Sequence, residues 1–251
     1  MRKVIILIVL FVFSHKGIAG WFECYNYSGE LGQQSIDLSI QFLGDKRERV
    51  EGVYKYNRIN TPIQLVGLER NGDTIKLNEL NNDVVTGKIT LIIKGDSLVG
   101  TWVSLNNLNK FPINLTLVSK LVDTLNGSIF SDVDLLFRQS TKKYYFVGIY
   151  SLQAEDWRAS MSMLNVIDKT TNKIAYQIDF SKNELLNGEV GNVMTVIYEN
   201  VVSTLLDKNG KLIQIRLTAN LGRMGCDFPL NYKFKSDKFL IDENDLNSYA
   251  P

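Results

Sequence analysis

Short runs of alternating polar and apolar residues recur along the first half of the chain. Residues 35–42 alternate without a break, and residues 111–119 alternate through Ile113, Leu115 and Leu117. Successive side chains of a β-strand point to opposite faces, so a period of two predicts strands with one buried face. Similar runs lie between them, at residues 50–57, 61–70, 73–80, 84–94 and 97–104. We therefore predict about seven strands in one antiparallel meander that closes toward a barrel.

Tight-turn sequences separate several of these runs. Asn71 and Gly72 follow one run, and Gly95 and Asp96 follow another. Asn, Asp and Gly tolerate a positive φ, which the two-residue turns of hairpins require. Residues 21–32 are aromatic and glycine-rich without a clear period, so no regular strand is predicted there.

The second half of the chain is also rich in β-type sequence. Residues 143–150 are an almost continuous run of aromatic and β-branched residues, which is typical of a strand buried on both faces. Further predicted strands are residues 158–167, 173–180, 193–202, 211–219 and 231–235. Other segments are predicted as a brief helix at 132–139, a loop at 222–229 and a frayed tail at 242–245.

The chain is thus predicted to be all-β, with a barrel domain at residues 20–120 and a second antiparallel β-sheet subdomain at residues 121–251. The boundary is placed around residues 121–131, where the pattern lapses. Because 45% of its 251 residues are hydrophobic, the chain is long enough to bury one extended core or two modest cores.

The start of the chain has the three parts of a secretory signal peptide. Residues 1–3 are basic, residues 4–13 are apolar, and residues 17–19 form a small-residue cleavage site. The apolar stretch is too short to span a bilayer, and Cys24 does not directly follow small residues as in a lipoprotein. We predict that residues 1–19 are removed and that the mature protein is periplasmic or secreted, without a stable membrane anchor.

Removal of the signal peptide changes the balance of charge. The chain has 28 basic and 27 acidic residues, and the signal peptide contains Arg2, Lys3 and Lys16 but no acid. The mature protein then carries 25 basic and 27 acidic residues and is nearly neutral. A protein that binds nucleic acid needs a clustered positive excess, so a nucleic-acid partner is not expected.

The single histidine, His15, lies inside the predicted signal peptide. Without an imidazole, the mature protein lacks the Ser-His-Asp and Cys-His arrangements of nucleophilic catalysis and the usual zinc and copper ligand sets. No glycine-rich phosphate loop precedes a helix, so no cofactor is predicted. Cys24 and Cys226 are the only thiols. In an oxidising compartment an even pair favours a disulfide, and two free buried thiols are the alternative.

Carboxylates are the remaining candidates for catalysis, because a glycoside hydrolase needs only two acids beside the scissile bond. The available acids, whose spacing selects no pair, are Glu69, Glu79, Glu155 and Asp156. Glu79 falls on the same alternation as Ile75 and Leu77, so its side chain is expected to face the apolar side. A buried carboxylate needs a partner, and Arg70 or Lys88 is expected to form an ion pair with it.

The first half contains five short sequence motifs, namely Gly52-x-Tyr54-x-Tyr56, Leu65-x-Gly67, Ile75-x-Leu77-x-Glu79, Thr86-Gly87 and Gly100-x-Trp102. Together they resemble a pattern of uncharacterised exported bacterial proteins with an N-terminal calycin-like or lipocalin-like β-barrel. The resemblance spans residues 36–117 and implies a calycin-like barrel, a fold that hosts many functions. In the second half, residues 166–169 and 174–178 resemble the β-sheet domain of periplasmic lysozyme inhibitors. The acidic segment expected next in those inhibitors is missing here, so no inhibitory residue is carried over.

The candidate binding residues are Tyr54, Tyr56, Glu79 and Trp102, with core packing at a barrel end as the alternative role of the aromatic side chains. We expect an exported, non-enzymatic binding protein, such as a periplasmic inhibitor or immunity protein that occludes a secreted hydrolase. The second expectation is a small-molecule or lipid carrier that uses the barrel mouth. The third is a carboxylate-based glycoside hydrolase.

Overall fold

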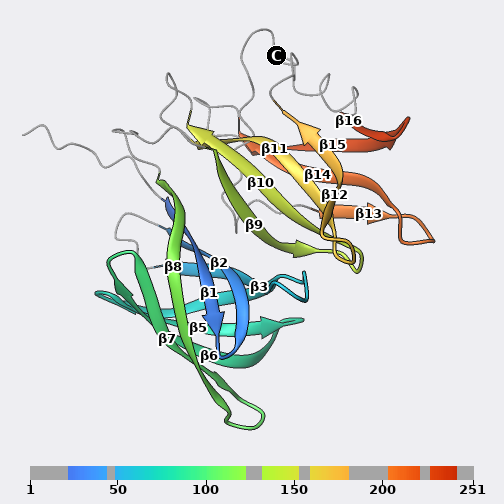
Figure 1. The fold of residues 1–251 in the computed structure, drawn as a ribbon. Coiled ribbons are helices and arrows are strands. Elements are labelled where there is room, and N and C mark those ends of the chain that lie inside the picture. Colours follow the sequence, from blue (N-terminus) through green and yellow to red (C-terminus); the bar gives the residue numbers. More distant parts are fainter. Residues whose placement is uncertain are drawn as a thin grey trace, which may run out of the picture.

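The computed structural model describes residues 22–43, 49–122, 132–152, 159–180, 203–220 and 227–241. Every helix or strand element in these ranges is a β-strand, and none of these residues belongs to a helix that could cross a membrane (Figure 1). Eight strands close an antiparallel barrel, and two four-stranded antiparallel sheets follow. The predicted all-β fold, with a barrel first and further sheet structure after it, is confirmed.

The barrel strands follow one another around the barrel in chain order, and β1 pairs with β8 to close it. The strands are β1 (Phe22–Leu31), β2 (Gln34–Leu43), β3 (Arg49–Tyr56), β4 (Ile63–Asn71), β5 (Thr74–Asn81), β6 (Val84–Lys94), β7 (Ser97–Ser104) and β8 (Lys110–Val122). The hairpin turns at Gly72 and Gly95 have φ values of 58° and 59°, as the turn sequences predict.

In the barrel, the strand that sequence analysis missed is β1. Its side chains at Tyr27 and Leu31 face the barrel interior, but Gly29 occupies the inward position between them, and Cys24 is buried in a different core. A strand with a glycine on one face and a buried residue on the other shows no clean period of two. The barrel therefore has eight strands where the pattern predicted about seven.

The interior of the barrel is filled by side chains. All eight strands contribute to one hydrophobic cluster in which each fully buried side chain is 4% exposed or less. A water-sized void among these side chains would raise their exposure, so these side chains leave little room for a ligand between them.

The second half forms two four-stranded sheets, in the orders β12-β11-β10-β9 and β13-β14-β15-β16. The strands are β9 (Val133–Ser140), β10 (Tyr144–Leu152), β11 (Ala159–Asp168), β12 (Lys173–Asp179), β13 (Ser203–Leu206), β14 (Leu212–Asn220), β15 (Asp227–Lys235) and β16 (Lys238–Ile241). Sequence analysis did not predict β13 or β16. The predicted strand at 193–202 and the predicted tail at 242–245 lie outside the described residues.

Two predictions for the second half were wrong. Residues 132–139 were expected to form a brief helix, but residues 133–140 form β9, which pairs with β10 and buries Val133, Leu135, Leu136 and Phe137 in a core. The loop expected at 222–229 is wrong for residues 227–229, which belong to β15 and pair with β14, whereas residues 222–226 lie outside the described residues. In both cases, pairing with a neighbouring strand decided the local structure.

One core joins the barrel to the two sheets. Cys24, Leu43, Val53 and Leu121 project from the barrel wall into a cluster with side chains of both sheets. Aromatic rings continue this core between the sheets, with the Tyr176 centroid 5.1 Å from that of Phe234 and 5.4 Å from that of Phe239. The barrel and the sheets are therefore packed against each other across buried apolar surface.

Polar contacts hold the β11–β12 turn and the end of β9 near the barrel. The Asn60 side-chain amide donates a hydrogen bond of 3.1 Å to the Lys169 carbonyl, and Arg138 Nη1 lies 3.9 Å from Glu51 Oε2. These contacts bring a segment of the second half beside the β3–β4 loop. This end of the barrel is where the candidate residues gather.

Candidate functional site

Four turns lie at one end of the barrel, which we call the mouth. They are the turns between β1 and β2, β3 and β4, β5 and β6, and β7 and β8, because alternate turns of an antiparallel meander fall at the same end. Tyr54 and Tyr56 lie at the end of β3, Glu79 near the end of β5 and Trp102 near the end of β7. The structure therefore brings all four predicted binding residues to the mouth.

Glu79 is the centre of this group and is only 6% exposed. Its Oε2 accepts a hydrogen bond of 2.5 Å from the Tyr54 hydroxyl and one of 2.6 Å from Trp102 Nε1. Its Oε1 accepts a hydrogen bond of 2.6 Å from Thr86 Oγ1. Hydrogen bonds to a charged acceptor are stronger than those between neutral groups, so three neutral donors stabilise a carboxylate at the barrel end.

The predicted partners of Glu79 were wrong. The guanidinium group of Arg70 lies 4.2 Å from the ring centroid of Phe42, and in the described residues Glu79 forms hydrogen bonds but no ion pair with Arg70 or Lys88. The expectation that Glu79 faces the buried side is confirmed. Thr86 was not predicted as a site residue. The Thr86-Gly87 motif did mark this position, since Gly87 pairs directly with Glu79 in the sheet.

Burial keeps the donor hydroxyl of Tyr54 protonated. Desolvation is the largest cause that raises the pKa of Tyr54 far above its ordinary value, and the negative charge of Glu79 adds to it. Burial also raises the pKa of Tyr56, whose ring lies edge-on to that of Tyr54 with centroids 5.4 Å apart. Tyr54 is therefore built as a hydrogen-bond donor to the carboxylate.

Gly87 makes room for the indole of Trp102. A Cβ atom at this position would lie 2.5 Å from Trp102 Nε1, which is far too close for two non-bonded atoms. A larger residue would push the indole away from Glu79. The motifs that contain Gly87 and Trp102 are thus explained together, because a glycine in a strand allows an aromatic ring to approach the backbone.

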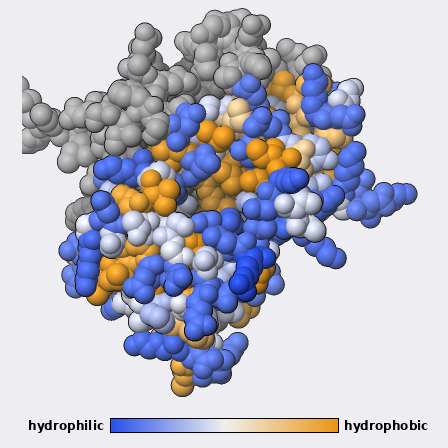
Figure 2. All heavy atoms as spheres, in the orientation of Figure 1, coloured by the Kyte–Doolittle hydropathy of each residue, from blue (hydrophilic) through white to orange (hydrophobic). Residues whose placement is uncertain are grey.

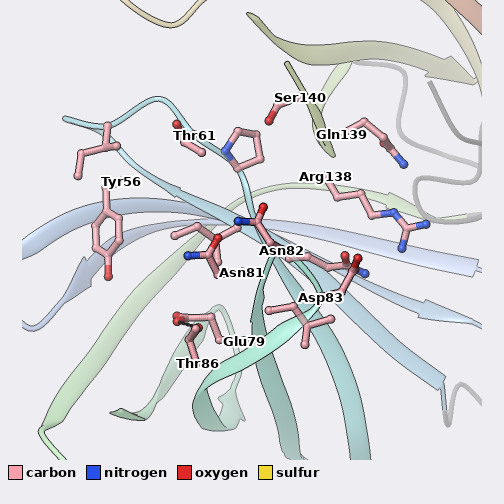
Figure 3. Close-up of a pocket in the computed structure, with 15 residues that line it drawn as sticks. Tyr56, Thr61, Glu79, Asn81, Asn82, Asp83, Thr86, Arg138, Gln139 and Ser140 are labelled. Atoms are coloured by element: carbon pink, nitrogen blue, oxygen red, sulfur yellow. Dashed lines mark hydrogen bonds between the residues drawn. The ribbon is translucent and has the colours of Figure 1, made fainter. Parts of the chain in front are cut away.

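A cleft of about 710 Å³ opens beside Glu79 (Figure 3). It is bounded by the β3–β4 loop, by the β5–β6 turn and by the end of β9. In Figure 3 the amides of Asn81 and Asn82 lie between Tyr56 and the end of β9. Gln64 and Gln139 also line this cleft, which gives it four side-chain amides.

A second hollow of about 650 Å³ adjoins Tyr56 from the other side. We call Tyr56, Trp102 and Phe111, which line it, the aromatic shelf. The rings of Trp102 and Phe111 are stacked, with centroids 5.7 Å apart and planes inclined by 27°. Because Tyr56 lines both spaces and Trp102 donates to Glu79, the shelf and the cleft share the same buried cluster.

Exposed apolar side chains stand on the turns of the mouth. Ile59 lies in the β3–β4 loop, Val84 starts β6, and Leu105 and Leu108 lie in the β7–β8 loop. We call these four residues the apolar tips. Leu108 is 75% exposed and has a φ of 57°. Figure 1 shows the β7–β8 loop reaching beyond the other turns of the mouth.

Hydrophobic surface also gathers away from the mouth. Figure 2 shows it over β9 and β10, in a hollow where the barrel meets the first sheet. A groove of about 580 Å³ lies between these parts, and the exposed side chains of Val118 and Ile174 line it. This groove contains none of the predicted site residues.

The remaining predicted residues are placed only in part. Cys24 is fully buried and forms no disulfide with another described residue, and burial raises the pKa of its thiol far above the ordinary value. Cys226, Glu155, Asp156 and the side chain of Glu69 lie outside the described residues, as does the predicted signal peptide. The disulfide and the signal peptide therefore stay predictions.

Compared with known proteins, the chain matches no family model, no curated protein and no solved structure. The described residues contain no group of three or more His, Cys, Asp or Glu side chains that is placed to hold a metal ion. The resemblances to exported barrel proteins and to lysozyme inhibitors stay expectations. Function has to be argued from the chemistry of the mouth.

Proposed function

We propose that the protein is an exported, non-enzymatic binding protein that holds a secreted hydrolase against the mouth of its barrel. The observation that carries this proposal is Leu108. A leucine at the tip of a loop gains little from folding when three quarters of its surface stays in water. A left-handed backbone costs a non-glycine residue about 1 kcal/mol, and Leu108 adopts one.

The exposed side chain and the left-handed backbone both disfavour a leucine at this position, so we expect a function to compensate for them. Asn or Gly would fit this backbone without the same strain, and Asn107 and Asn109 stand directly beside it. Strained positions that stability does not explain are typical of functional sites. A partner that buries Leu108 would supply the favourable term that the free protein lacks.

The other apolar tips extend the same surface. Ile59 and Val84 are 62% and 64% exposed, and they stand on neighbouring turns of the mouth. Exposed apolar side chains that stability does not explain are candidates for a protein interaction site. A loop that reaches out from a rigid barrel fits a concave surface, and the active-site cleft of a hydrolase is concave.

The other two expectations have less support. The described side chains fill the barrel interior, so a carrier that uses the barrel mouth would have to hold its ligand in the hollows of the mouth. A glycoside hydrolase needs an acid that is available to its substrate, whereas both oxygens of Glu79 already accept hydrogen bonds from neighbouring side chains. This supports a structural role for Glu79.

The proposal is tested by measuring the binding of the exported chain to secreted cell-wall hydrolases of its source by biolayer interferometry. Leu108→Asn should weaken binding at least tenfold, because burial of one leucine contributes about 1.5–3 kcal/mol. The same change should raise the melting temperature, because it relieves the backbone strain. Ile92→Asn is the matched control, since Ile92 is an exposed apolar residue of the barrel wall.

Failure of every hydrolase to bind at micromolar concentration would refute the proposal. Equal affinity of the Leu108→Asn variant and the parent protein would refute the role of the mouth. A loss of affinity with a gain in stability distinguishes the proposed contact from misfolding, which would lower both.

A further inference from the structure

We infer that the cleft and the aromatic shelf together bind a neutral oligosaccharide. This ligand is distinct from the protein partner proposed above, and its site depends on the polar and aromatic residues of the two hollows rather than on Leu108. The inference starts from the chemistry of the cleft lining.

The cleft is lined mainly by groups that both donate and accept hydrogen bonds. Side-chain amides come from three separate segments, namely Gln64 in β4, Asn81 and Asn82 at the end of β5, and Gln139 in β9. The hydroxyl groups of Tyr56, Thr61 and Ser140 lie on the same lining. A sugar hydroxyl also donates and accepts, so amides and hydroxyls match it in either direction.

One of these groups lacks a hydrogen-bond partner in the part of the chain that the structure describes. The Oε1 atom of Gln139 is buried and has no hydrogen-bond partner, although buried polar atoms in proteins are almost always paired. Gln139 lines the cleft. A rotation of the Gln139 side chain toward the cleft would let a hydroxyl group of a bound ligand supply the missing donor.

Two of the three charged side chains that line the cleft, those of Glu79 and Arg138, have partners within the protein. Glu79 accepts three hydrogen bonds, and Arg138 lies close to Glu51. An anionic ligand would approach the carboxylates of Glu79 and Asp83, which line the cleft. Like charges in such a site are unfavourable, so the lining favours a ligand without charge.

The aromatic shelf supplies the second half of saccharide recognition. A sugar ring has one face of C–H groups, and such a face packs well on an aromatic ring. The stacked rings of Trp102 and Phe111 offer such a surface, and the amides of Gln33 and Gln34 line the same hollow. Because Tyr56 lines both hollows, one ligand with several sugar units can contact the shelf and the cleft together.

The experiment titrates the exported chain with neutral cello-, chito-, malto- and xylo-oligosaccharides by isothermal titration calorimetry. One neutral series should bind. Asn81→Ala and Phe111→Ala should each weaken it about tenfold, which corresponds to one lost contact. Asn81 and Phe111 are exposed, so the fold should persist. Asn114→Ala, which removes an exposed amide on the barrel wall outside these hollows, should bind as the parent does.

Sulfated oligosaccharides and fatty acids are titrated as the competing ligand classes. Tighter binding of either class than of every neutral series would overturn the inference. So would the absence of neutral saccharide binding up to about 5 mM, which is a weak affinity of about 3 kcal/mol, or a neutral affinity that both variants leave unchanged. Leu108→Asn should not alter saccharide binding, so failure of this inference is distinguishable from failure of the hydrolase proposal.

Discussion

Replacement of Glu79 by Leu or Gln tests the hydrogen-bonded cluster most directly. Leucine has a similar size but cannot accept a hydrogen bond. Glutamine can accept through Oε1 from Tyr54 and Trp102, and its Nε2 can donate to Thr86 Oγ1 because a hydroxyl group also accepts. The two variants therefore separate the loss of the acceptor from the loss of the charge.

The magnitude follows from the three contacts. A buried donor that loses its partner costs about 1–3 kcal/mol. Tyr54 is 1% exposed and should bear the full cost in Glu79→Leu, whereas the half-buried Thr86 and Trp102 can gain water partly from the hollows. We expect Glu79→Leu to lower the free energy of unfolding by about 3–5 kcal/mol and Glu79→Gln by about 1 kcal/mol.

Thermal unfolding followed by circular dichroism measures the difference. In a protein of this size 1 kcal/mol shifts the melting temperature by about 2–4 °C. Glu79→Leu should therefore melt about 6–20 °C below the parent protein and Glu79→Gln only about 2–4 °C below it. A double-mutant cycle adds a control, because Tyr54→Phe should destabilise the parent but cost almost nothing beside Glu79→Leu.

Equal melting temperatures of the Leu and Gln variants would refute the reasoning. That result would mean that the three donors find other partners when the carboxylate is absent. Additive effects of Tyr54→Phe and Glu79→Leu would likewise contradict direct coupling between these two side chains.

Three further predictions concern the same end of the barrel and the two cysteines. Gly87→Ala should displace the Trp102 indole, since the added Cβ would lie 2.5 Å from its Nε1. We expect a red-shifted fluorescence maximum and a loss of about 1–3 kcal/mol in the free energy of unfolding. An unchanged fluorescence spectrum would contradict the packing of Gly87 against Trp102. Because burial raises the pKa of Tyr54, the folded protein keeps this proton while an unfolded tyrosine loses it near pH 10. Stability measured by urea unfolding should therefore fall as the pH rises above about 10, and Tyr54→Phe should make this fall shallower. Peptide mapping of the non-reduced exported chain should join the Cys24 peptide to the Cys226 peptide, whereas two alkylated free thiols would disprove the disulfide.

The barrel strands were largely predictable because their signal is local. Residues 84–94 and 97–104 were predicted with the bounds that β6 and β7 have, since the alternation and the flanking turn residues lie within each segment. Prediction failed at β1, where Gly29 interrupts the inward positions. It also failed at β9, where a short segment was taken for a helix although its residues pair with β10.

For the candidate site, the residues could be predicted from the sequence, but their contacts could not. The residue types and the short sequence motifs indicated Tyr54, Tyr56, Glu79 and Trp102 as candidate binding residues. The buried side of Glu79 was also predicted correctly from its alternation with neighbouring residues. The expected ion pair was wrong, however, because Glu79 accepts hydrogen bonds from neutral donors instead, and two of its three partners come from strands 23 and 25 residues away in the chain.

The amino-acid sequence by itself determined the β-type segments, their turns and the chemical types available for a site. These are short-range properties, since adjacent side chains of a strand point to opposite faces and a turn needs particular residues within a few positions. Only the tertiary structure decided that eight strands close, that four turns gather Glu79 with its donors, and that β9 completes the cleft. Those features depend on pairing and packing between segments distant in the chain, and such contacts leave no periodic trace in any one of them.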